Sequence, residues 1–372
     1  MGGTQDVGAM VAWGGFILGM AFGAVANRTN FCTMGAVSDV VNMGSWGRMR
    51  MWLLAIAVAI IGTHALQLTG QIDIAKSIYV RPNFTWLSYG LGGLLFGIGM
   101  TLGSGCGSKT LVRLGAGSLK SVVVFVFFGI AAYMTLKGLF AIWRTAWIDP
   151  VAVDFASHGV PRQDLPTLVS TLSGASPRTT ETLLAGATAM GLLAFVFKDR
   201  DFRASVDHVL GGTVVGLTIV GGWYVTGHMG FGENPQTLED TFLGTNSHTI
   251  ESLSYTAPVG YTLELLMLWS DRSLTVTFGI AAVIGIIVGS FVYAVASRTF
   301  RWEGFAGPED TANHVIGGIL MGFGGVTALG CTVGQGLSGL STLALGSILV
   351  FFAIVAGSAA TMKWQYWRMS RE

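Results

Sequence analysis

The sequence predicts an all-α integral membrane protein with a pseudo-two-fold internal repeat, whose two halves meet at a narrow central passage. The first observation is composition, because 51% of the residues are hydrophobic and only 11% are charged, whereas an average soluble domain has about 25% charged residues. The second is a cysteine motif that occurs twice, and the third is that both copies interrupt hydrophobic runs. With 372 residues and about 20 per spanning helix, the chain has room for roughly eight to ten membrane segments, re-entrant ones included.

The repeated motif spans Gly103–Thr110 in the first half and Leu329–Gly336 in the second. The two halves align without a gap at a shift of 225 residues, which pairs Cys106 with Cys331. The same shift pairs five glycines of one half with five of the other: Gly92 with Gly317, Gly93 with Gly318, Gly97 with Gly322, Gly99 with Gly324 and Gly105 with Gly330. Close helix packing explains a high glycine content but not an ungapped repeat, so we expect two halves of related structure.

Both motifs fall inside hydrophobic stretches, where the apolar runs 90–102 and 316–329 meet a cysteine among small residues. At membrane depth, irregular backbone is tolerated only where it is buried in protein or lines a cavity. Transporters use such broken helices to hold an ion near the middle of the bilayer. The motifs therefore predict broken or re-entrant helices that meet at a central hourglass constriction.

The other elements follow from apolar runs of spanning length, at 8–26, 51–68, 122–139, 181–197, 209–225, 274–296 and 343–362. The first of these ends at a polar break, Asn27–Gly35, which again contains a cysteine, Cys32. Residues 149–180 form the longest polar loop and contain four prolines. We therefore expect a first membrane repeat at 1–148, a polar connecting loop at 149–180 and a second membrane repeat at 181–372.

Charged residues between the runs predict the orientation. The Lys198–Arg203 loop, the loop with Arg298 and Arg301 and the C-terminal tail are basic, and the 233–251 loop is acidic. Basic loops of membrane proteins stay in the cytoplasm. We expect these three segments inside and the acidic loop and the N-terminus outside.

The residues near the breaks indicate the kind of ligand. Arg28, Lys109 and Arg113 lie there, whereas the cysteine motifs contain no aspartate or glutamate, an arrangement that suits a small anion. A thiol is a weaker hydrogen-bond donor than a hydroxyl or a backbone N–H, so repeated cysteines point to a ligand that itself presents sulfur. Three cysteines without close spacing indicate neither a disulfide framework nor a zinc site, and we expect no metal, no cofactor and no catalytic residue.

The residues that we expect along the path are Cys32, Cys106, Cys331, Lys109, Gly105, Gly330, Gln335, Arg28, His228 and Met229. Met229 is included because a shift of 197 residues, which pairs Gly15 with Gly212, places it opposite Cys32. Packing roles are the alternative: the cysteines as small buried apolar residues, Arg28 as an interfacial side chain, and His228 with Met229 as core residues.

At these motifs the chain resembles the YeeE/YedE family of thiosulfate transporters. The likeness rests on Asn27–Cys32, on Gly105–Gly117, on the glycines from Gly317 to Gly324 and on Gly330–Gly336. The resemblance implies an hourglass-shaped helical protein with pseudo-two-fold halves. It also implies that thiosulfate passes Cys32, Cys106 and Cys331 by S–H···S hydrogen bonds without covalent attachment. A small cytoplasmic sulfur-carrier-like protein accompanies such proteins and is an expected partner. Lys109 departs from the family pattern, since some relatives have glycine there.

These observations together predict a multi-pass inner-membrane transporter that takes up thiosulfate or a related sulfur or selenium anion, and not an enzyme. The net charge of +1 gives no indication of a nucleic-acid partner; the expected surroundings are the lipid bilayer. Two alternatives remain open. One is a membrane thiol oxidoreductase or sulfurtransferase that uses Cys106 and Cys331, and the other is a small-anion channel without preference for sulfur.

Overall fold

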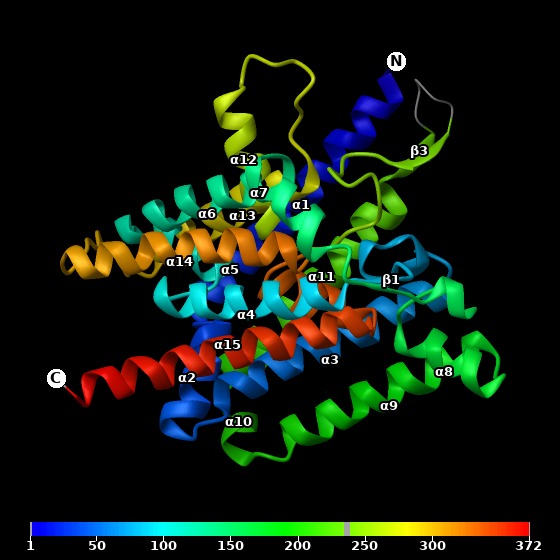
Figure 1. Ribbon diagram of the computed structural model, residues 1–372, viewed down its shortest axis with the longest axis horizontal. Coiled ribbons are helices and arrows are strands. Elements are labelled where there is room, and N and C mark those ends of the chain that lie inside the picture. The colour runs from blue at the N-terminus through cyan, green and yellow to red at the C-terminus, as the bar shows by residue number, and fades with distance from the viewer. Residues whose placement is uncertain (1, 234–238, 372) are drawn as a thin grey trace.

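The computed structural model describes residues 2–233 and 239–371, and most helices run along the long axis of the molecule (Figure 1). Residues 234–238 of the acidic loop lie outside the described residues. The main helices are α1 (Gly2–Arg28), α3 (Gly47–Leu68), α4 (Trp86–Leu102), α6 (Leu119–Lys137), α9 (Pro177–Phe197), α11 (Val206–Tyr224), α12 (Thr256–Met267), α13 (Phe278–Ala296), α14 (Pro308–Thr327) and α15 (Leu345–Met369). The chain is predominantly helical, as the sequence predicts.

Short elements join the main helices. The short α-helices are α2 (Thr33–Ser38), α5 (Gly107–Gly115), α7 (Leu139–Trp143), α8 (Leu165–Ser173) and α10 (Arg200–Ala204). The π-helical turns are η1 (Asp39–Met43), η4 (Arg144–Ile148), η6 (Val225–Met229) and η7 (Gly334–Gly339), and the 3₁₀ turns are η2 (Ile74–Lys76), η3 (Ile78–Val80) and η5 (Ala156–His158). Two antiparallel pairs of short strands, β1 (Asn83–Phe84) with β2 (Val153–Asp154) and β3 (Phe231–Glu233) with β4 (Asp240–Phe242), complete the described chain.

Eight helical segments of the described chain are long and apolar enough to cross a membrane: 6–43, 47–68, 86–115, 119–137, 177–197, 206–229, 278–296 and 345–369. This confirms a multi-pass membrane protein. Each spanning run expected from the sequence falls on one of these segments, although α13 begins at Phe278, later than the expected residue 274. The 149–180 loop contains β2, η5 and α8 and the start of α9 at Pro177.

Glycines bring α4 and α14 into backbone contact. A Cβ atom on Gly92 would lie 2.7 Å from the carbonyl oxygen of Gly324, and one on Gly324 would lie 2.6 Å from that of Gly92. Gly99 and Gly317 meet in the same way, with 2.7 Å in both directions. These contacts cross the sequence repeat. The repeat pairs Gly92 with Gly317 and Gly99 with Gly324, whereas in the structure Gly92 contacts Gly324 and Gly99 contacts Gly317. Any side chain at these positions would force the helices apart, so glycine is required.

Other helices of one half of the chain also pack against helices of the other half. α4 also packs on α15, and α14 also packs on α6, while α1 packs along α13 and α3 packs on α11. The helix before each repeated break therefore contacts a helix that follows the other break. The pseudo-two-fold symmetry of the whole molecule stays a prediction.

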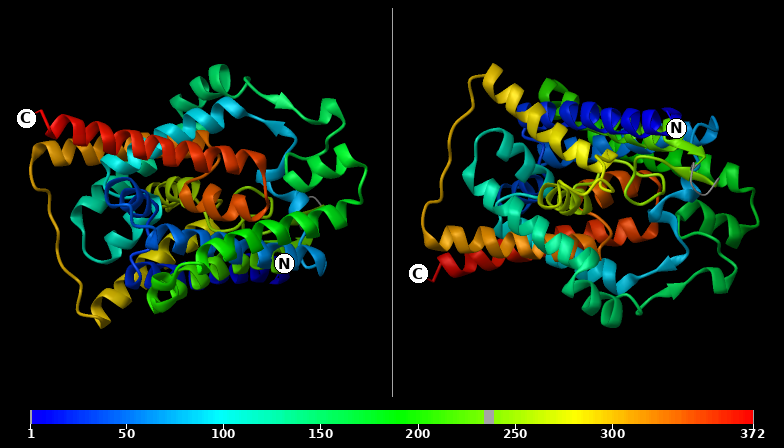
Figure 2. Two further views of the ribbon diagram at one scale, coloured as in Figure 1. Left: turned by 90° about the horizontal axis from the view of Figure 1, so that it is seen from below. Right: turned by 90° about the horizontal axis from the view of Figure 1, so that it is seen from above.

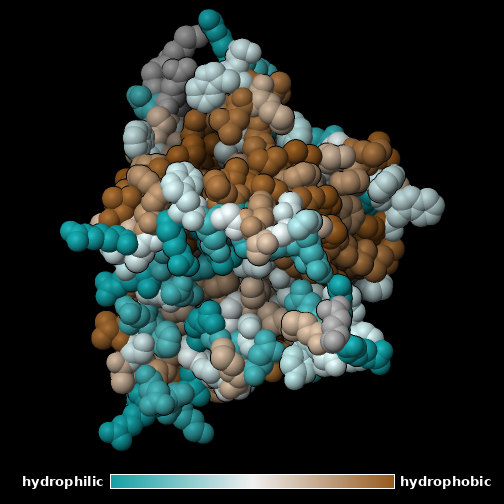
Figure 3. All heavy atoms as spheres, turned by 90° about the vertical axis from the view of Figure 1, so that its left-hand side faces the viewer, coloured by the Kyte–Doolittle hydropathy of each residue, from teal (hydrophilic) through white to brown (hydrophobic). Residues whose placement is uncertain are grey.

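The two ends of the molecule differ. The N-terminus, α8, β1 and β3 lie at the right-hand end in Figure 1, and the C-terminus lies at the left-hand end; the segment between α13 and α14 runs along the left-hand end in both views of Figure 2. Viewed from the C-terminal end, hydrophilic side chains gather in the middle and lower part of the surface and hydrophobic ones above them (Figure 3). The basic segments, which are α10, the segment between α13 and α14 and the C-terminal tail, lie towards this end in Figures 1 and 2, as the positive-inside prediction requires. Which side of the membrane this end faces stays a prediction.

Candidate functional site

The three cysteine breaks share one backbone geometry. In each, the residue two positions before the cysteine has a left-handed backbone, with φ of 51° at Asn30, 57° at Ser104 and 57° at Leu329. The next N–H then bonds to the carbonyl five residues back, at 3.1 Å for Phe31 to Ala26, 2.8 Å for Gly105 to Met100 and 2.7 Å for Gly330 to Gly325. This is the Schellman ending of a helix. Cys32, which has no cysteine counterpart in the second half, therefore sits at a third copy of the same structure.

Each cysteine then precedes a new helical segment. The Sγ atoms of Cys32 and Cys331 each accept a hydrogen bond from the backbone N–H three residues on, of Gly35 and Gly334, both at 3.4 Å. Cys106 precedes α5, and its Sγ lies 3.3 Å from the Ser108 hydroxyl oxygen. Backbone N–H groups thus hold the thiols of Cys32 and Cys331, and the Ser108 hydroxyl contacts that of Cys106.

All three thiols are buried and free of disulfide bonds, with exposed fractions of 5% for Cys32, 1% for Cys106 and 0% for Cys331. Cys106 is the middle member. Cys32 lies next to it, and Cys331 lies within electrostatic range of it. The fold therefore gathers the three cysteines, which are separated by up to 299 positions in the chain, in the order 32, 106, 331.

The cations that the sequence singled out have different positions. Lys109, in the first turn of α5, lies beside Cys32 and Cys106, and its Nζ donates to Asn30 Oδ1 at 3.3 Å. Arg113 donates to the carbonyl of Ser104 at 3.0 Å and so fastens the break. Arg28 is instead exposed and forms an ion pair with Asp207 at 3.1 Å. Of these three cations, Lys109 is the one whose charge lies beside the thiols.

Gln335 is buried and holds the second break together. Its Nε2 donates to the carbonyl of Ala328 at 2.6 Å, and its Oε1 accepts from the Ser347 hydroxyl at 2.6 Å. Both ends of the amide thus bind the scaffold. The neighbouring Gly330 has a positive φ of 159°, and a Cβ atom added there would lie 3.1 Å from the Gln335 side chain. Gly105 has the equivalent place before Cys106.

His228 and Met229 belong to η6, at the end of α11. His228 is exposed and stacks on Tyr224 with ring centroids 5.1 Å apart, and Met229 is half-buried against the core. In the second half, Tyr255 precedes α12. Tyr255 is fully buried and lies within electrostatic range of Cys331, as does Tyr79. The polar run from Ser252 to Thr256, just before Pro258, is the sequence signal for this element.

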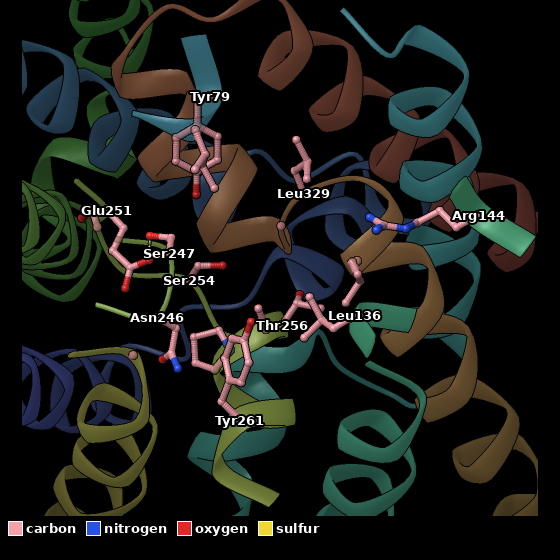
Figure 4. Close-up of a pocket in the computed structure, with 18 residues that line it drawn as sticks. Tyr79, Leu136, Arg144, Asn246, Ser247, Glu251, Ser254, Thr256, Tyr261 and Leu329 are labelled. Carbon is pink, nitrogen blue, oxygen red and sulfur yellow. Dashed lines mark hydrogen bonds between the residues drawn. The ribbon is translucent and has the colours of Figure 1, made fainter. Parts of the chain in front are cut away.

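A cavity of about 190 Å³ lies on the Cys331 side, and we call it the first vestibule (Figure 4). Its walls include Tyr79, Arg144, Glu251, Ser254, Thr256 and Gly330. Arg144 extends its guanidinium group towards the middle of this view (Figure 4), and its Nε lies 3.5 Å from Asp149 Oδ2. The first vestibule thus reaches the glycine that directly precedes Cys331.

Glu251 is the carboxyl group in this wall. Its side chain accepts a hydrogen bond from the Ser247 hydroxyl at 2.9 Å. Burial disfavours the charged form and raises the pKa of Glu251 to about 7, while the bond from Ser247 opposes the rise. The vestibule therefore contains a group whose charge changes near neutral pH.

A second cavity of about 390 Å³, which we call the second vestibule, lies on the side of Ser104. Its lining combines parts of α2, α4, α14 and α15, including Met34, Thr101, Asp310 and Tyr366. Ser104, of the Cys106 break, lines the second vestibule, and Leu329, of the Cys331 break, lines the first vestibule. The buried cysteines follow two residues after these lining positions.

The fold and site define a class: a multi-pass helical membrane protein with buried thiols at breaks in its helices and cavities beside two of those breaks. The family model described as "Sulphur transport" matches residues 28–360, so the chain belongs to the sulphur transport family. The match includes all three breaks. A family of transport proteins supports the expectation that the chain is not an enzyme.

Two curated relatives cover nearly the whole chain. The protein is 26% identical to the thiosulfate transporter TsuA of Spirochaeta thermophila over 377 aligned residues, which cover 96% of this chain and 99% of the relative. It is 29% identical to the thiosulfate transporter TsuA of Escherichia coli (strain K12) over 336 residues, which cover 87% of this chain and 86% of the relative.

Proposed function

We propose that the protein takes up thiosulfate across the inner membrane, by a path that leads from the first vestibule past Cys331, Cys106 and Cys32 to the second vestibule. The observation that carries the proposal is the gathering of three buried thiols at three equivalent helix breaks. The names of the two TsuA relatives support the choice of thiosulfate.

The chemistry of the anion supports this choice as well. Thiosulfate has a terminal sulfur atom, which is soft and polarisable and can pair with a thiol, whereas sulfate presents only oxygen. Lys109 supplies a positive charge beside Cys32 and Cys106, which compensates part of the charge of a dianion that has left water. A sulfur-bearing anion uses both features.

Passage is proposed to be non-covalent. Covalent capture would require a thiolate to attack the terminal sulfur of thiosulfate, forming a cysteine persulfide and releasing sulfite. Each thiolate would repel an incoming dianion, and burial penalises the charged form of a thiol. Neutral thiols that form S–H···S hydrogen bonds avoid both costs.

Uptake of radiolabelled thiosulfate by a sulfur-auxotrophic host tests the function, with sulfate uptake measured in parallel. We expect thiosulfate uptake that depends on the protein and does not respond to a mild reductant, with all three thiols free by mass spectrometry after turnover. An accumulating persulfide or Cys106–Cys331 disulfide would favour the oxidoreductase or sulfurtransferase alternative. Equal transport of sulfate and thiosulfate would favour the non-selective anion channel.

The expected partner, a small cytoplasmic sulfur-carrier-like protein, is part of this proposal. Its docking place would be at the second vestibule, where the path ends. Co-purification of the two proteins from membranes, with and without thiosulfate, tests the association. Failure to associate would remove the partner and leave the transport proposal in place.

A further inference from the structure

Threonine follows the residue that precedes a central helical segment at three places: at two of the cysteine breaks, Thr33 after Cys32 and Thr332 after Cys331, and at the start of α12, Thr256 after Tyr255. All three are buried, with exposed fractions of 2%, 1% and 1%. Within the described part of the chain, the hydroxyls of Thr33 and Thr256 have no hydrogen-bond partner, and the Thr332 hydroxyl has none besides the Cys106 thiol. Buried hydroxyls usually have partners, so the recurrence of this pattern needs an explanation.

Many other threonine hydroxyls in the helices bond to the carbonyl four residues back, as Thr101 does with Gly97 at 3.1 Å and Thr135 with Ala131 at 2.7 Å. A threonine at the first position of a helix has no helical carbonyl there, because the residue four back lies before the helix. For Thr332 that residue is Ala328, whose carbonyl already accepts from Gln335 Nε2 at 2.6 Å. The break thus leaves the hydroxyl available.

The hydroxyls accompany the thiols. The Thr332 side chain lies against the Cys106 thiol, as its effect on that group shows. Thr256 lines the first vestibule, where Figure 4 shows its side chain beside the cavity. Thr33 adjoins Cys32 in the chain and begins α2. A ligand that moves along the thiols therefore meets, at each of these threonines, a hydroxyl that has no oxygen or nitrogen partner in the described chain.

We propose that Thr33, Thr256 and Thr332 recognise the oxygen atoms of the transported anion, while the thiols face its sulfur atom. This inference rests on the proposed function and deepens it. A hydroxyl donates a stronger hydrogen bond than a thiol, so the pair of groups suits an anion that has hard oxygens at one end and soft sulfur at the other. The hydroxyls determine specificity for a sulfur oxyanion over a sulfur species without oxygen.

The test compares two substitutions at one position. Thr332→Val keeps the shape of the side chain and removes the hydroxyl, whereas Thr332→Ser keeps the hydroxyl and removes the methyl group. Purified variants in proteoliposomes are assayed for initial uptake of radiolabelled thiosulfate below saturation. A hydrogen bond to a charged group corresponds to a change of about tenfold or more, so we expect T332V to lose at least that factor and T332S to stay near wild type. Thr33→Val should behave like T332V.

Thr63→Val is the matched control. Thr63 is buried and also has no hydrogen-bond partner among the described residues, but it lies inside α3 rather than at a break. Its variant should transport normally, and the amount and monodispersity of each variant verify folding. Normal uptake by T332V and T33V would overturn the inference, as would equal loss in T332V and T332S, which would indicate a packing role. Absence of thiosulfate uptake in the wild type would overturn the proposed function itself.

Discussion

Glu251 makes uptake depend on pH, if the first vestibule is the entrance for the anion. The half-buried Glu251 lies in the wall of a cavity of about 190 Å³, and the loss of water around its carboxyl group raises the pKa to about 7. It loses its proton as the pH rises through 7, and the vestibule then gains a negative charge that opposes a dianion. Thiosulfate itself stays a dianion over this range. Uptake should therefore fall as the pH rises.

The structure sets the size of the effect. A spherical cavity of about 190 Å³ is about 7 Å across, and at this separation a unit charge repels a dianion by about 5 kcal/mol at an effective dielectric near 20. This excludes the anion from the charged vestibule almost completely, so uptake follows the protonated fraction. With a pKa of about 7, that fraction is about 91% at pH 6 and about 9% at pH 8, which gives roughly a tenfold difference in rate.

Several groups face Glu251 and bear on its titration. Ser247 donates to it, and Tyr79 and Tyr261 lie within electrostatic range of it, while Arg144 lines the same cavity. Neither phenol ionises near neutral pH, because burial raises the pKa of Tyr79 and of Tyr261. The carboxyl group is therefore the one among these that changes charge between pH 6 and pH 8.

Initial uptake rates in proteoliposomes measure this effect, with the pH on the vestibule side varied from 6 to 8 and the other side held constant. Glu251→Gln should transport at the rate of the acidic wild type at every pH. Asp271→Asn, at an exposed carboxyl in the loop before α13, is the control and should keep the wild-type profile. A flat wild-type profile, or a Glu251→Gln variant with the wild-type pH dependence, would refute the reasoning.

Three further predictions concern the thiols, the lysine and the glycine contact. Cys106→Ala and Cys331→Ala should each abolish thiosulfate uptake. Each should lower the free energy of unfolding by only about 1 kcal/mol, since a single sulfur atom is removed. Uptake near the wild-type rate in both variants would contradict the thiol path. Lys109→Met should reduce uptake and weaken inhibition by divalent anions more than by monovalent ones, because its charge acts twice as strongly on a dianion; unchanged inhibition constants would show that the lysine does not face the path. Gly99→Ala should lower the melting temperature of the detergent-solubilised protein, because its Cβ would lie 2.7 Å from the Gly317 carbonyl oxygen. Gly90→Ala is the control and should leave the melting temperature unchanged, because a Cβ there has nothing within 4 Å. Equal melting temperatures would show that α4 and α14 are able to separate without cost.

Hydrophobicity and spacing were sufficient to predict the fold class and the breaks. The apolar runs gave the spanning helices, and the cysteine motifs marked where helices end, because a cysteine among small residues interrupts helical hydrophobic patterns. The common backbone geometry of the breaks could not be predicted from the sequence. Asn30, Ser104 and Leu329 have the same left-handed conformation, but three different side chains at one structural position give no shared letter in the sequence.

Side-chain partners could not be predicted in the same way. Gln335 was expected along the path, yet its two bonds, to Ala328 and Ser347, depend on how the second break folds back on α15. Arg28 meets Asp207, which is 179 positions away. Tyr255, which lies within electrostatic range of Cys331, was not predicted because no motif repeat marks it, and a path role for Met229 stays a prediction.

The crosswise contact of α4 and α14 restricts how transport can work. Four glycines hold the two backbones against each other on either side of the centre, so the helices form a fixed seam through the molecule. Rocking of one half against the other would have to open this seam, whereas rearrangement of the short segments around the cysteines would not. We therefore expect α4 and α14 to stay in place during transport, and only the short segments around the cysteines to move as the anion passes. A covalent cross-link between α4 and α14 should then leave uptake intact, and loss of uptake on cross-linking would show that the halves must move apart.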